Sequence, residues 1–118
     1  PPLAPRLVAA DPRKFFAYVL DPSNAEGKDG IFVGLFGYRS RSEEDGRMLA
    51  ATYVEQARTR LATGEYSVGR VDRHGQRYVL PIDLQGRRLR SIWIWRPSGV
   101  FALVTPFSGF VDRRRREP

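Results

Sequence analysis

The spacing of apolar residues changes near residue 65 of the chain. Before that point apolar residues recur every three or four positions, which is typical of helices with one buried stripe. After it they alternate with polar residues, which is typical of strands with one buried face. The sequence therefore predicts an α+β fold, with three N-terminal helices packed on one face of a three- to four-stranded antiparallel sheet.

The three expected helices span residues 11–20, 27–37 and 42–64. The third carries the clearest end signals. Ser40 or Ser42 can cap its first turn, which the acidic residues 43–45 fill, and Gly64 follows its last turn. This helix should therefore begin and end near these residues.

The expected strands span residues 66–71, 78–84, 89–96 and 101–105, with a hairpin turn at 85–87. The residues of the third expected strand indicate which face of the sheet is buried. One of its faces holds Leu89, Ser91, Trp93 and Trp95, and the other holds Arg90, Ile92, Ile94 and Arg96. On an exposed face the tryptophans could stack on bases. Because a buried unpaired guanidinium is costly, we expect the tryptophans to face the helices and the arginines to face outward.

The 118 residues, 42% of them hydrophobic, suit one compact domain. We expect residues 1–10 to be a linker or processing remnant, 11–110 to be the domain, and 111–118 to be a basic tail. No apolar run approaches the ~20 residues of a membrane-spanning helix, so we expect no membrane partner. Without cysteine and with one histidine, we also expect neither a metal nor a cofactor.

The charge balance points to an anionic partner. The chain has a net charge of +7, and 18 of its 20 basic residues are arginine. A high genomic GC content would give the same excess of arginine. Whatever its origin, the planar guanidinium grips phosphates, so RNA is one expected partner and an acidic protein is another. The candidate contacts are Arg73, Arg77, Arg88, Arg90 and Arg96.

His74 is the first candidate for catalysis because it is the only histidine and can accept or donate a proton near neutral pH. Arg73 and Arg77 beside it should favour the neutral imidazole, which suits a general base. The alternative is a plain hairpin turn with the imidazole in solvent.

Three further residues are candidates for catalysis. Lys28 stands at an expected helix start, where unpaired backbone N–H groups attract anions, although it could equally be a solvated first-turn lysine. Tyr78 and Thr105 lie on expected strands and could orient a phosphate. Both residue types also favour strands by propensity alone.

Several short motifs resemble a family of small uncharacterised bacterial domains. Its first motif is matched by Gly27, Lys28, Phe32, Gly37 and Tyr38. Its later motifs are matched by 74–78, 92–94 and 103–105, so the likeness covers roughly residues 11 to 107. His74 stands where the family pattern often has a tyrosine.

The resemblance implies a domain of the kind found at the C-termini of modular bacterial proteins, including polymorphic toxins. The expected order of helices and strands is also similar to that of the barnase–EndoU–colicin–RelE group of ribonucleases. By this analogy the domain would be a metal-independent ribonuclease in which the 2′-hydroxyl attacks the phosphate. It would be exported, act in the cytoplasm of a target cell and be neutralised by an acidic immunity protein.

In that interpretation His74 would move the proton, while Lys28 with Arg90 or Arg96 would stabilise charge on the phosphate. Tyr78 and Thr105 would orient it. The alternative interpretation is a non-catalytic module that binds nucleic acid or an acidic protein through an arginine-rich sheet face. The sequence leaves the oligomeric state open.

Overall fold

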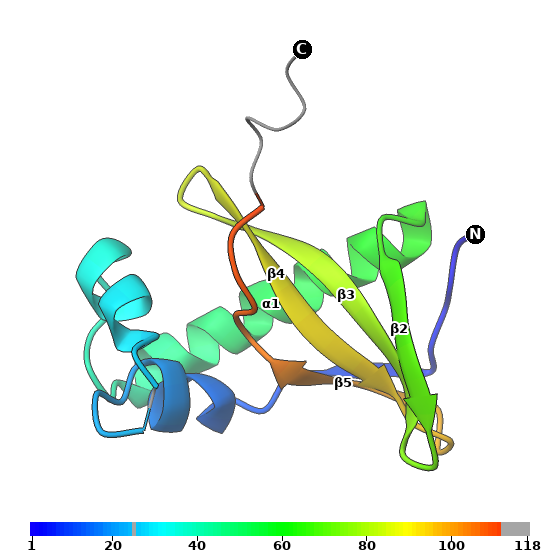
Figure 1. Ribbon diagram of the computed structural model, residues 1–118, viewed down its shortest axis with the longest axis horizontal. Helices are drawn as coiled ribbons and strands as arrows, with labels where there is room; N and C mark the ends of the chain where they lie inside the picture. Colours follow the sequence, from blue (N-terminus) through cyan, green and yellow to red (C-terminus); the bar gives the residue numbers. More distant parts are fainter. Residues whose placement is uncertain (25, 112–118) are drawn as a thin grey trace.

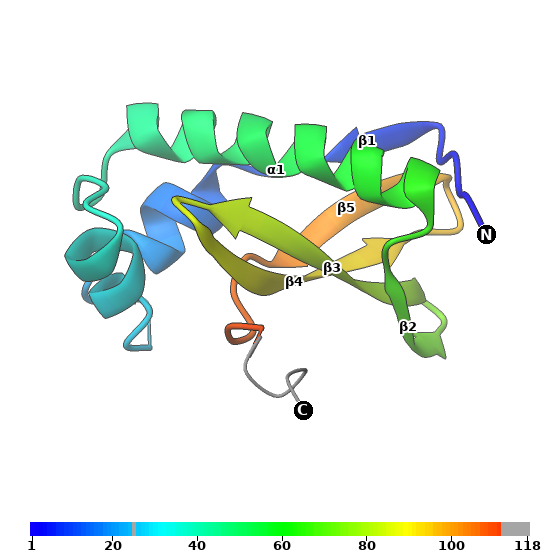
Figure 2. The same ribbon diagram turned by 90° about the horizontal axis from the view of Figure 1, so that it is seen from above.

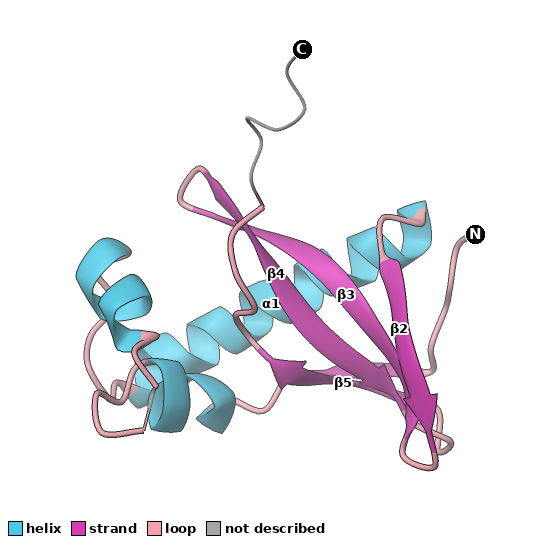
Figure 3. Ribbon diagram, in the orientation of Figure 1, coloured by secondary structure: helices cyan, strands magenta, loops and turns pink. Residues whose placement is uncertain are grey.

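The computed structural model describes residues 1–24 and 26–111. Strand β1 (Leu7–Ala9) comes first, followed by two short π-helical segments, η1 (Phe15–Val19) and η2 (Gly30–Leu35). The long helix α1 (Glu43–Thr63) then leads into strands β2 (Ser67–Asp72), β3 (Gly75–Leu84), β4 (Arg87–Trp95) and β5 (Val100–Thr105). Figure 3 shows these helices and strands along the chain.

The structure has two layers. Figure 1 shows α1 running behind the sheet, and Figure 2 shows the other face of the sheet without a covering helix. The strand order is β1-β5-β4-β3-β2, with β1 parallel to β5 and the remaining neighbours antiparallel. The segments η1 and η2 gather beside the N-terminal end of α1 (Figure 2).

The expected fold of three helices on a three- to four-stranded antiparallel sheet is wrong. One long helix covers a five-stranded mixed sheet, and the first two expected helices shorten to η1 and η2. Residues 7–9, inside the expected linker, form β1 because Val8 is buried and the strand pairs with β5. A strand of three residues is too short to show an alternating pattern in the sequence. Its position depends on a partner strand about ninety residues away. Residues 112–118 of the expected tail lie outside the described residues.

Helix α1 begins and ends where its end signals predict. The Ser42 hydroxyl accepts a hydrogen bond from the Asp45 backbone N–H, and Gly64 ends the helix in a left-handed conformation. The inward side chains Leu49, Tyr53, Ala57 and Leu61 are buried against the sheet. This stripe fixes which face of the sheet is covered.

The tryptophan face of β4 is confirmed as the covered face. Leu89, Ser91 and Trp93 are fully buried, and Arg90 is exposed. The Trp93 indole N–H donates to the Ser91 hydroxyl at 2.8 Å, and that hydroxyl donates to the Leu80 carbonyl at 2.9 Å. The polar atoms that enter the core with Trp93 are thereby satisfied.

The segment after β5 continues along the edge of β4 that pairs with β5. Arg90 exchanges backbone hydrogen bonds with this segment, donating to the Gly109 carbonyl and accepting from the Ser108 N–H. Phe107 turns back into the core against Phe32. The C-terminal part of the described chain is therefore tied to both the sheet and η2.

We expect Gly75→Ala to lower the free energy of unfolding by more than about 1 kcal/mol, measured by urea denaturation. Gly75 has a positive φ of 138°, and an added methyl group would overlap the Trp95 carbonyl oxygen. Gly30→Ala is the matched control, because nothing lies within 4 Å of its added methyl group. Equal stability of the two variants would contradict this account.

Candidate nucleic-acid interface

His74 lies on the turn between β2 and β3, and its side chain is exposed. Its backbone N–H donates to Asp72 Oδ1 at 2.8 Å, and Arg77 pairs with Asp72 Oδ2 at 3.0 Å. These contacts, the backbone N–H first, lower the pKa of Asp72. The turn is thus organised around Asp72, which accepts from both the His74 backbone and the Arg77 side chain.

Tyr78 lies on the covered face of the sheet, where it packs against Tyr66 and Phe101 with ring centroids 5.4 and 5.5 Å away. It is 8% exposed, and burial raises the pKa of its hydroxyl. A side chain in this position packs the core and is on the opposite face from the outward arginines.

Lys28 lies at the other end of the molecule from His74. Its ammonium donates to the Tyr18 hydroxyl at 2.8 Å, and that hydroxyl donates to Glu26 at 2.8 Å. Figures 1 and 2 both show the η1–η2 region and the β2–β3 turn at opposite ends of the molecule. The structure therefore does not bring Lys28 and His74 to one phosphate.

Thr105 lies at the end of β5, beside η1. It lines a pocket of about 420 Å³ together with Tyr18, the residue that Lys28 contacts. We call this space the η1 pocket. Of the four candidate catalytic residues, the structure associates only Lys28, through Tyr18, and Thr105.

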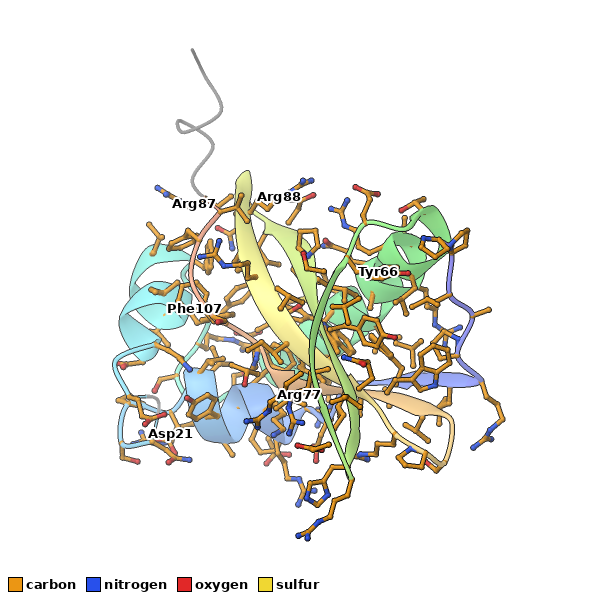
Figure 4. The ribbon with its side chains drawn as sticks, turned by 45° about the vertical axis from the view of Figure 1, so that its right-hand side comes forward. Asp21, Tyr66, Arg77, Arg87, Arg88 and Phe107 are labelled. Carbon is orange, nitrogen blue, oxygen red and sulfur yellow. The ribbon has the colours of Figure 1, made fainter. Side chains whose placement is uncertain are left out.

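The uncovered side of the sheet holds three of the candidate nucleic-acid contacts. We define the open face by the residues of β3 and β4 that point away from α1: Arg77, Val79, Pro81, Asp83, Arg88, Arg90, Ile92 and Ile94, of which Ile94 is buried. In Figure 4, Arg77 lies toward the lower end of this sheet and Arg88 beside the β3–β4 hairpin. Arg90 lies directly opposite Pro81 of β3. Pro81 is four residues, or about 13 Å, along that strand from Arg77.

Arg88 is held by a carboxylate on the neighbouring strand. Its Nε and one terminal nitrogen donate to the two oxygens of Asp83 at 2.8 and 3.0 Å, and Arg60 from α1 donates to Asp83 at 2.8 Å. These contacts, led by Arg88, lower the pKa of Asp83. One carboxylate thus orients two guanidinium groups at the edge of the open face.

Gln56 ties the same position to the helix. Its side-chain amide donates to the Asp83 carbonyl and accepts from the Asp83 N–H, both at 2.8 Å. The register of β3 against α1 is therefore fixed at the residue that orients Arg88.

A shallow hollow of about 360 Å³ lies on the open face. Arg88 and Arg90 line it, with Val79 and Pro81 supplying apolar surface. Arg90 is exposed, and within the described residues it forms no ion pair with a carboxylate. Its Nε donates to the Ser108 carbonyl at 3.4 Å, and the guanidinium keeps its positive charge for an anion.

The remaining candidates, Arg73 and Arg96, flank the end of the open face near Arg77. Arg73 lies on the β2–β3 turn, and Arg96 follows β4 directly. The Arg96 backbone lies against Gly75, which places the two arginine-bearing turns side by side. Both side chains are exposed. The basic surface thus runs from these turns to the β3–β4 hairpin.

Sequence reasoning missed the roles of Asp83, Arg60 and Lys14. The pair of Asp83 and Arg88 could have been found, because they stand directly opposite each other across the two-residue turn at 85–86. The contact of Arg60 with Asp83 depends on the packing of α1 and has no local signal. Lys14 lines the η1 pocket, and its rarity among so many arginines was the available signal.

No group of three or more histidine or carboxylate side chains with metal-binding geometry occurs within residues 1–24 and 26–111. In the same ranges, no helix has the length and hydropathy needed to cross a membrane. The chain matches no protein-family model, no curated protein and no solved structure. The function must therefore be inferred from the residues themselves.

We expect the stabilising contribution of Asp83 to be lost in acid. Its folded-state pKa is lowered, so this contribution is present above the unfolded pKa of about 3.9 and disappears as the pH falls through the folded value. The difference in free energy of unfolding between the wild type and Asp83→Asn should therefore be clear at pH 7 and shrink below about pH 4.

Urea denaturation at a series of pH values measures this difference. Glu55→Gln is the control, since Glu55 is an exposed α1 carboxylate that forms no ion pair within the described part of the chain. A pH-independent difference for Asp83→Asn would contradict the ion-pair account.

Proposed function

We propose that this domain binds the phosphate backbone of RNA along the open face and does not cleave it. The observation that carries the proposal is the row of Arg77, Arg88 and Arg90 on the uncovered side of the sheet. Asp72 holds Arg77 through one terminal nitrogen. Asp83 occupies Nε and one terminal nitrogen of Arg88, which leaves the other terminal nitrogen of Arg88 for a phosphate. Arginine side chains fixed in this way lose less conformational freedom when they bind a phosphate.

The length of the basic surface favours a linear polyanion over a compact acidic protein. It runs from Arg73 and Arg96, past Arg77, to Arg90 and Arg88 near the far hairpin. A nucleic acid presents charges along such a line, and each phosphate neutralised by arginine releases a counterion.

The contacts should be largely independent of base sequence. Single-stranded nucleic acids are often bound by aromatic side chains that stack on bases. Here the sheet aromatics Tyr78, Trp93 and Phe101 are buried on the covered face, and Trp95 is half-buried against Tyr78 and Phe101. Phosphate contacts remain as the main source of affinity.

The separation of the candidate catalytic groups supports a non-catalytic function. His74 is exposed on the β2–β3 turn, whereas Lys28 is bonded to Tyr18 beside η1. A general base and a charge-stabilising group must both reach the reacting phosphate. The folded chain supports binding better than this chemistry.

We expect Arg90→Ala to weaken binding of a labelled oligouridine, measured by fluorescence anisotropy between about 50 and about 200 mM salt. Loss of one phosphate contact should reduce the slope of log K against log salt by about 0.7. Arg47→Ala is the matched control, because it removes the same charge from an exposed position on α1.

Equal effects of Arg90→Ala and Arg47→Ala would show that only net charge matters and would overturn the proposed surface. A labelled poly-glutamate peptide is tested alongside the RNA. Binding of the peptide without binding of the RNA would overturn the choice of RNA and favour an acidic protein partner.

We also expect the oligouridine to remain intact when incubated with a high concentration of the protein in EDTA, as followed by denaturing gel electrophoresis. His74→Ala should still bind the oligouridine, and neither protein should cut it. Cutting by the wild type that His74→Ala abolishes would instead establish the metal-independent ribonuclease.

A further inference from the structure

The η1 pocket is another place where cationic and polar groups converge, and its Thr105 pairs with Ile92 at the margin of the open face. It is formed between η1 and the end of β5, with a volume of about 420 Å³. This is within the range of pockets that hold small organic ligands. Its walls include the Asp11–Arg13 ion pair, Lys14, Tyr18 and Thr105, with Ala17 and Val104 supplying apolar surface.

The segment that forms one wall has an unusual backbone. In η1 the Leu20 N–H donates to the Phe15 carbonyl five residues earlier, at 2.8 Å. Short π-helical turns are rare and often occur at functional sites. Phe15 and Val19 are fully buried and anchor this turn, while Lys14, Ala17 and Tyr18 line the pocket.

Tyr18 is fixed by both of its neighbours. Its hydroxyl accepts from Lys28 at 2.8 Å and donates to Glu26 at 2.8 Å, and the Lys28 ammonium lies 4.8 Å from the ring centroid. The ring is thus held as a rigid wall. The chain has two lysines. Lys14 lines this pocket, and Lys28 contacts the pocket residue Tyr18.

The charge available to an anion in the pocket comes from Lys14 and not from Arg13. Arg13 already uses Nε and a terminal nitrogen on the two oxygens of Asp11, at 2.7 to 3.2 Å. Its fork is therefore not open for bidentate binding of a carboxylate. Lys14 is half-buried and forms no ion pair within the described residues, which leaves a compact point charge of the kind that binds phosphates.

We propose that the η1 pocket binds a small phosphate monoester that carries a planar ring, as a nucleoside monophosphate does. Lys14 and the Thr105 hydroxyl contact the phosphate, and Tyr18, Ala17 and Val104 form the wall for the ring. The site uses none of the open-face arginines, so it does not depend on the RNA-binding proposal.

Isothermal titration calorimetry of the full chain with AMP, adenosine and inorganic phosphate tests this inference. We expect AMP to bind more tightly than either part alone. Lys14→Ala should weaken AMP binding about tenfold or more, because a charge-assisted hydrogen bond is lost, and Lys14→Arg should retain part of the affinity. Thr105→Val should weaken AMP binding and leave adenosine binding unchanged.

Arg47→Ala is the control for net charge, and circular dichroism confirms that each variant is folded. Equal loss of AMP binding in Lys14→Ala and Arg47→Ala would overturn the site. AMP binding no tighter than that of inorganic phosphate would also overturn it, since the ring would then contribute nothing. Oligouridine binding is measured on the same samples, so that failure of the open-face proposal is scored separately.

Discussion

Only one face of the sheet is covered, and the packing of α1 on that face determines where every strand side chain goes. Trp93 and Tyr53 are fully buried between the two layers. Their polar atoms are satisfied internally, by Ser91 for the indole and by the Pro106 carbonyl for the hydroxyl, at 2.8 and 2.9 Å. Because successive strand residues point to opposite faces, burying Trp93 forces Arg90 and Ile92 outward.

The same constraint arranges the charges. Two carboxylates at the sheet, Asp72 and Asp83, each accept a hydrogen bond from an open-face arginine. They lower the local positive charge but hold Arg77 and Arg88 in defined positions. Arg90, between them along the sheet, donates to the Ser108 carbonyl and has no carboxylate partner within the described residues. The open face therefore combines oriented and free guanidinium groups, which is a suitable arrangement for a flexible polyanion.

The two proposed sites are built in different ways. The open face depends on the register of the strands and on the two hydrogen bonds between Gln56 and Asp83. The η1 pocket depends on a short π-helical turn held by Phe15 and by the contacts of Tyr18 with Lys28 and Glu26. The first offers a surface to a long anion, and the second offers an open pocket to a small phosphate monoester.

Local signals in the sequence determined the parts of the fold that depend on neighbours along the chain. The Ser42 cap, the Gly64 stop, the β3–β4 hairpin and the alternating faces of β4 could all be predicted. The outward direction of Arg90 followed from that alternation. For the candidate site, the sequence thus supplied the basic face but not the contacts that orient it.

Only the tertiary structure decided what depends on distant partners. The parallel pairing of β1 with β5, the contact of Arg60 with Asp83 and the burial of Tyr78 join residues far apart in the chain. The separation of His74 from Lys28 and the convergence of Lys14, Tyr18 and Thr105 arise in the same way. Side-chain periodicity reports which face of an element is buried, whereas the partner that buries it is set by long-range packing.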